Sequence, residues 1–215
     1  ILYDDKHQKG KGVRIIDTET KETFEFYAKI IFINASTINT ASLLLGSKSN
    51  RFPDGLGNDS GELGHNLMDH HFRCGASGFA EGYDDKYYYG YRPNGIYIPR
   101  FQNLNGDKRD YIRGFGYQGS ASRQGWTREI AEMGIGADFK DLLSEPGKWN
   151  MGILGFGETL PYHDNKIILN KNIKDKWGMP TISFDCEIKD NEKKMRLDMM
   201  EDGAEMLEAA GLKNV

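Results

Sequence analysis

Three histidines and an aspartate lie within seven residues and form the densest group of potential metal ligands in the sequence. His65 and Asp69 are four residues apart, so a helix would bring them onto one face, and His70 and His71 follow directly. Imidazole and carboxylate groups bind zinc or iron. The spacing differs from the H-E-x-x-H pattern, however, and a metal site needs three or four converging ligands. The sequence offers no second cluster to complete a site, so we expect no metal here.

A second set of polar residues lies where the sequence alternates as β-strands do. Glu158 lies at an expected strand end, beside the small residues of the stretch 155–161, and Gln118 and Arg123 belong to a polar stretch with one tryptophan, 117–126. Such side chains beside a glycine-containing strand suit the hydroxyl groups of a sugar. A solvated strand edge and an ordinary surface loop explain the same residues equally well, so both interpretations stay open at this point.

A turn of small residues, Ala35, Ser36 and Thr37, separates an apolar stretch at 28–34 from a helical pattern at 38–47. The first N–H groups of a helix have no partner within it, and together with the helix dipole they favour anionic or polar ligand atoms. The more common arrangement is a turn closed by its own cap, with Ser36 or Thr37 accepting a hydrogen bond as N-cap. From the residues alone the capped turn is the stronger hypothesis.

The surrounding elements predict an α+β chain with a mostly antiparallel sheet flanked by helices and a short α/β remnant at the N-terminus. The apolar run at 28–34 is typical of a strand buried on both faces, as in a parallel sheet. Asp190 begins a helix of about 20 residues that Gly211 should end. The turn-rich stretch 48–64 indicates a crossover between two domains. The other expected elements are a hairpin at 12–28, a short helix at 62–71, and strands at 72–79, 96–101, 109–117, 151–158, 166–169 and 181–186.

Composition excludes several classes of protein. The 28 basic and 32 acidic residues give a net charge of −4, which argues against nucleic acid as a partner. No apolar run approaches the roughly 20 residues of a membrane-spanning helix, so we expect no membrane insertion. Cys74 and Cys186 are too few for a disulfide framework, although one bridge or two thiols remain open. Oligomeric state and compartment, whether cytoplasmic or periplasmic, stay undetermined.

Taken in order, several stretches resemble the glucose–methanol–choline (GMC) family of flavin oxidoreductases. The strongest is 35–45, which is similar to the second signature of that family, and 64–70 resembles its G-x-N-L-x-D-H stretch. Ser36 departs from the glycine usual in that signature. Further similarity lies at 12–17, 28–32, 158–161, 165–169 and 175–180, so the resemblance covers nearly the whole chain.

The resemblance implies an enzyme that oxidises the CH–OH group of an alcohol, with a sugar or polyol as one option, by hydride transfer to FAD. It implies that residues 1–48 end an FAD-binding domain and 49–215 form a substrate-binding domain. It also implies that Ala35, Ser36 and Thr37 lie near the flavin. By the same resemblance, Asn66, Asp69 and His70 brace the domain junction. To these we add Gln118, Arg123 and Glu158 as candidate groups on the substrate side.

The nucleotide-binding glycine motif of the family would precede Ile1, and its catalytic histidine would follow Val215. The resemblance therefore describes a central fragment that contains no catalytic residue. We expect such a fragment neither to hold FAD tightly nor to be active alone. The alternative is a non-catalytic α+β module that binds a carbohydrate or a partner.

Overall fold

The computed structural model describes residues 1–85, 95–125 and 135–215 and has the expected α+β fold. The chain forms two compact units. The first unit comprises residues 1–68 and 160–187, and the second comprises 69–159 and 188–215. The predicted domains, 1–48 and 49–215, concern cofactor and substrate binding, and that assignment stays a prediction. Cys74 and Cys186 form no disulfide, and none of the helices in the described ranges has the length and hydropathy needed to cross a membrane.

The first unit contains two small antiparallel sheets and one helix. Strands β1 (Leu2–Asp4), β2 (Lys9–Ile16) and β3 (Thr23–Tyr27) pair in that order, which confirms the hairpin predicted at 12–28. Helix α1 (Ser36–Gly46) packs on β8 (Lys166–Lys174), which pairs with β9 (Pro180–Asp185).

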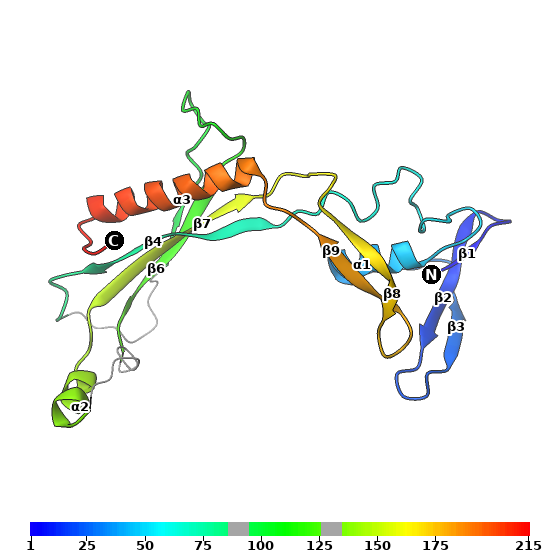
Figure 1. The fold of residues 1–215 in the computed structure, drawn as a ribbon, viewed down its shortest axis with the longest axis horizontal. Helices are drawn as coiled ribbons and strands as arrows, with labels where there is room; N and C mark the ends of the chain where they lie inside the picture. Colours follow the sequence, from blue (N-terminus) through cyan, green and yellow to red (C-terminus); the bar gives the residue numbers. More distant parts are fainter. Residues whose placement is uncertain (86–94, 126–134) are drawn as a thin grey trace. The chain divides into compact units, whose positions relative to one another are not determined.

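The second unit is an antiparallel sheet with a long helix on one face. The strand order is β4 (His70–Ala80), β7 (Trp149–Glu158), β6 (Phe115–Arg123) and β5 (Gly95–Ile98). Helix α3 (Asp190–Ala209) lies along β4 and β7, as Figure 1 shows, and α2 (Ala137–Ser144) lies between β6 and β7 in the sequence. Gly211 has φ +90°, and its N–H donates to the carbonyl of Glu208. The N–H of Leu212 donates to the carbonyl of Leu207. These two hydrogen bonds are typical of a helix that ends at a glycine.

Helix α3 lies close to the sheet because β7 presents glycines to it. A Cβ atom on Gly155 would lie 2.6 Å from Met199 Cγ, and one on Gly157 would lie 2.5 Å from Met195 Sδ. Both methionines are fully buried, and Tyr117 on the neighbouring strand donates its hydroxyl to the Met199 carbonyl at 2.9 Å. Because successive residues of a strand point to opposite faces, Phe156, which lies between these two glycines, faces away from α3.

Two expected elements do not form. Residues 28–34 are not a strand, and Ile30 and Phe32 are 72% and 81% exposed. Burial on both faces requires flanking strands, and no strand among the described residues pairs with this segment. The helix expected at 62–71 is also absent, since Gly64 and Asn66 have positive φ angles that no α-helix accommodates.

Two further predictions are wrong in detail. The strand expected at 109–117 begins only at Phe115, because Arg113 has φ +74° and turns the chain before it. Helix α1 begins after Ala35, and no side chain caps it, so neither Ser36 nor Thr37 is the predicted N-cap. Ser36 itself has φ +64°.

Candidate functional site

A cleft of about 350 Å³ opens on the face of the second unit's sheet that lies opposite α3. Its floor contains Phe156 and the backbone of Gly114, Gly116 and Gly157. Polar side chains from β4, β5, β6, β7 and the loop before β6 gather around this floor: His70, Tyr97, Arg100, Arg113, Gln118 and Glu158.

Strand register explains why these side chains meet. His70 pairs with Glu158 where β4 and β7 lie side by side, and Tyr97 of β5 pairs with Gln118 of β6. Directly paired residues of antiparallel strands project from the same face of the sheet. Four polar groups thus line one open surface.

Glycines on β6 and before it let side chains lie flat on the backbone. A Cβ on Gly114 would lie 2.7 Å from Arg100 Nε, and one on Gly116 would lie 3.4 Å from the Tyr97 hydroxyl. Glycine in or beside a strand permits a close approach of this kind, because it has no side chain. In the structure that space is used by Arg100 and Tyr97, which form one wall of the cleft.

The charged groups of the cleft differ in their partners. Arg113 forms an ion pair with Glu158, with Arg113 Nη1 and Glu158 Oε2 3.2 Å apart. Arg100 donates its Nε–H to the backbone carbonyl of Gln102 at 3.1 Å. Among the described residues, no carboxylate lies within ion-pair distance of the Arg100 guanidinium.

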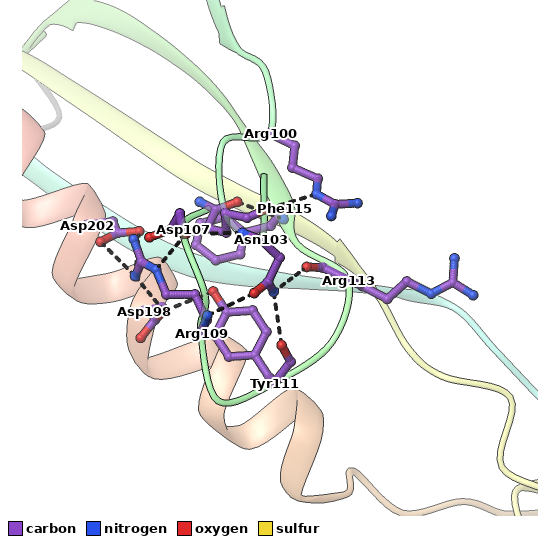
Figure 2. A network of polar contacts seen from close by, with 10 residues as sticks. Arg100, Asn103, Asp107, Arg109, Tyr111, Arg113, Phe115, Asp198 and Asp202 are labelled. Carbon is purple, nitrogen blue, oxygen red and sulfur yellow. Dashed lines mark hydrogen bonds and ion pairs between the residues drawn. The ribbon is translucent and has the colours of Figure 1, made fainter. Parts of the chain in front are cut away.

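Arg100 and Arg113 lie near the two ends of a loop, residues 99–114, that a polar network fixes to α3 (Figure 2). The side-chain amide of Asn103 donates to the carbonyls of Tyr111 and Arg113 at 2.9 and 2.8 Å, while its oxygen accepts from the Arg109 N–H at 2.8 Å. One side chain therefore ties the two ends of the loop together. Figure 2 shows the two guanidinium groups at the ends of the loop pointing away from the network.

Arg109 and Tyr111 connect this loop to α3. Arg109 Nη1 donates to Asp198 Oδ2 at 2.7 Å and lies 3.4 Å from Asp202 Oδ2, and the Tyr111 hydroxyl donates to Asp198 at 2.9 Å. Burial opposes the charge on Arg109, but its hydrogen bonds to Asp198 and Asp107 outweigh that effect and raise its pKa. Burial and the hydrogen bond to Asp198 raise the pKa of Tyr111 as well, so it remains a neutral donor.

The candidate substrate-side residues lie in two places. Gln118 and Glu158 both line the cleft. Arg123 lies at the far end of β6, where its side chain is 8% exposed and donates to the carbonyls of Gly147 at 2.8 Å and Asp84 at 2.7 Å. These contacts hold Arg123 to neighbouring loops away from the cleft, and Trp126 of the same polar stretch lies outside the described residues.

The residues expected near a flavin lie in the first unit, and those expected at a domain junction are divided between the two units. Ala35, Ser36 and Thr37 form the N-terminus of α1, whose N–H groups no side chain caps. Asn66 donates its side-chain amide to Glu62 Oε2 at 2.6 Å. Asp69 and His70 begin the second unit, with the His70 N–H donating to Asp69 Oδ1 at 2.7 Å. The unit boundary falls between Asn66 and Asp69, and the roles of all six residues remain predictions.

His71, the last residue of the histidine cluster, is buried on the α3 side of the sheet. Its Nε2 atom has no hydrogen-bond partner. Burial, and next the charge of Arg196, lower its pKa, although Glu192 acts in the opposite direction. In the part of the chain that the structure describes, no three histidine, cysteine or acidic side chains converge on a common metal position.

Comparison with known proteins relates the chain to two enzymes. No family model matches it. It is 31% identical over 196 residues to 2-methyl-1,2-propanediol dehydrogenase of Mycolicibacterium austroafricanum, a match that covers 87% of this chain and 34% of that protein. It is 26% identical over 169 residues to the fructose dehydrogenase large subunit of Gluconobacter japonicus, covering 74% of this chain and 29% of that protein. Both relatives are named as dehydrogenases. The chain spans about a third of their length.

Sequence reasoning missed the two arginines and Tyr97 of the cleft. Arg100 and Arg113 lie at either end of the loop 99–114. The alternating pattern at 109–117 predicted a strand over the second part of this loop. The signal that could have found them is Asn103 followed by Gly106, since Asn and Gly favour left-handed turn positions. Both residues do have positive φ angles, +54° and +94°.

Proposed function

We propose that this chain is the substrate-binding part, with a piece of the cofactor domain, of an FAD-dependent oxidoreductase of the GMC type. The longer enzyme would oxidise the CH–OH group of a small alcohol or sugar. The observation that carries this proposal is the similarity to two dehydrogenases, which extends over 87% and 74% of the chain. The motif resemblance at 35–45 and 64–70 supports the flavin family within that broader class.

The cleft suits the binding of a hydroxyl-bearing substrate. Gln118 supplies an amide donor and acceptor, Tyr97 a hydroxyl, and Glu158 carboxylate oxygens. Such groups on one face of a sheet orient an alcohol by several hydrogen bonds at once, while Phe156 supplies an apolar surface for its carbon atoms. These residues would bind and position the substrate, and no residue of this chain is assigned the proton transfer.

The N-terminus of α1 suits a polar group of a cofactor. Ser36 and Thr37 are exposed, and the helix leaves its first N–H groups without a side-chain cap. Those N–H groups would donate to carbonyl or phosphate oxygens of the cofactor. FAD, when bound, supplies the acceptor for the hydride.

The test uses the longer protein encoded around this sequence. We expect it to purify with stoichiometric flavin absorbance and to reduce a dye in the presence of an alcohol. Glu158→Gln should raise KM for that alcohol, whereas Glu205→Gln, on the exposed surface of α3, should leave it unchanged. The 215-residue chain alone should be colourless and inactive.

Three results would contradict the proposal. A longer protein without flavin would exclude the cofactor, and flavin or alcohol-dependent dye reduction in the isolated chain would exclude the inactive fragment. A gene that encodes nothing on either side of this sequence, combined with carbohydrate binding by the chain, would favour the non-catalytic module instead.

A further inference from the structure

The Arg100 guanidinium is held at its Nε atom, while its two terminal nitrogens bind no group of the described residues. Its Nε–H is fixed by the carbonyl of Gln102, and its side chain lies against Gly114, where a methyl group would collide with it at 2.7–3.1 Å. Gln102 is itself fully buried and accepts the N–H of Phe115 at 3.2 Å, so the anchor is rigid. The two terminal nitrogens of Arg100 have no partner among the described residues.

The charges around Arg100 leave the cleft with a positive excess. Two arginines line it, and the carboxylate that lines it, Glu158, is already paired with Arg113. His70 is the other titratable group of basic character there, and it lies 3.6 Å from Asp69. Within the described ranges, Arg100 therefore has no compensating carboxylate in the cleft.

A fixed arginine with two parallel free N–H groups matches the two oxygens of a carboxylate. Such bidentate bonds are roughly twice as strong as neutral hydrogen bonds and are geometrically specific. A neutral hydroxyl would use only one donor and would leave the charge uncompensated. A phosphate dianion carries more negative charge than one unpaired arginine balances.

We propose that the cleft binds a hydroxy acid, such as a sugar acid, whose carboxylate Arg100 receives in a bidentate contact while Gln118 and Tyr97 bind its hydroxyls. That the bound hydroxy acid is oxidised rests on the proposed function, whereas its binding in the cleft does not. It narrows the substrate class from alcohols in general to alcohols that carry a carboxylate, and it makes Arg100 the residue that determines specificity.

The test compares D-galactonate with galactitol, which share a carbon chain and differ at one end, where a carboxylate replaces a hydroxymethyl group. Isothermal titration of the 215-residue chain at low salt should show galactonate binding at least about tenfold more tightly than galactitol. Arg100→Gln should weaken galactonate binding by about 10- to 100-fold and leave galactitol unchanged, and Arg100→Lys should fall between. Arg14→Gln, in the first unit, is the matched control and should change neither.

Several results would overturn the inference. These are equal affinities for the two ligands, a loss of both in Arg100→Gln, no binding of either at millimolar concentration, and tighter binding of a sugar phosphate than of galactonate. In the longer enzyme, a higher kcat/KM for galactitol would also overturn it and leave the proposed function intact. If the longer protein held no flavin and oxidised neither compound while the chain still preferred galactonate, the binding inference would stand and the proposed function would fail.

Discussion

Replacing Gly155 by alanine tests whether the close approach of α3 to β7 depends on the missing side chain. The new Cβ would lie 2.6 Å from Met199 Cγ and 2.8 Å from its sulfur, whereas carbon atoms in contact prefer about 3.5–4.0 Å. Met199 is fully buried, so its side chain cannot move aside into solvent without disturbing its neighbours. Overpacking of this kind costs about 1–3 kcal/mol, and the lower backbone entropy of alanine in the unfolded chain returns about 0.5–1 kcal/mol. We expect a net loss of about 0–2.5 kcal/mol, with a central value of about 1 kcal/mol.

Gly152→Ala is the matched control, because it lies on the same strand and its Cβ would meet nothing closer than 3.5 Å. The free energy of opening can be measured for α3 and β4 by hydrogen–deuterium exchange and mass spectrometry, with urea unfolding as a second measurement. A cycle with Met199→Ala should show a favourable coupling, since the smaller side chain makes room for the new methyl group. Equal effects of Gly155→Ala and Gly152→Ala, or strict additivity in the cycle, would refute the packing argument.

Three further substitutions test other parts of the structure. The pKa of His71 is lowered by burial and by Arg196 from its ordinary value of 6.5, so the unfolded chain binds the proton more tightly and stability should fall as pH drops from 6.5 toward the lowered value. In urea unfolding measured from pH 7.5 to 5, His71→Gln should remove the contribution of His71 to the dependence of stability on pH. An unchanged pH dependence in this variant would contradict the prediction. Arg109→Met leaves Asp198 without its cation in a partly exposed site and should cost about 1–2 kcal/mol in urea unfolding, whereas a neutral effect would show that the network carries no stability. Asn165→Ala breaks two hydrogen bonds to the Glu187 backbone and should cost about 1–3 kcal/mol, seen as faster exchange at 185–188, and unchanged exchange there would contradict it.

Elements whose signals are local could be predicted from the sequence. The helix α3 was expected at Asp190 with a stop at Gly211, because its apolar spacing and terminal glycine are properties of the segment itself. The hairpin at 12–28 and strands β4, β7, β8 and β9 follow from alternation between turn residues in the same way. In each case the pattern and the final environment agree.

Elements that depend on distant neighbours could not be predicted. The apolar run at 28–34 contains nothing that distinguishes a strand buried on both faces from an exposed segment, because only partner strands decide between them. At 62–71 and 109–117 the spacing favoured regular structure, but left-handed positions at Asn66 and Arg113 interrupt it. Outside glycine such positions are uncommon; asparagine is enriched at them and gives some indication at Asn66, whereas the residue type gives none at Arg113.

The same distinction explains how much of the cleft could be predicted. Gln118 and Glu158 lie on regular strands, where the alternation of side chains along the strand determines which face each side chain is on. Arg100 and Arg113 lie at the ends of a loop whose course is set by Asn103 and by the contacts of Arg109 with α3. The cleft face of the sheet thus depends on the packed face behind it, because the helix that buries the core also anchors the loop bearing the cationic groups. Substitutions on α3 should therefore alter ligand binding without contacting the ligand, and the sequence alone contains no local sign of that connection.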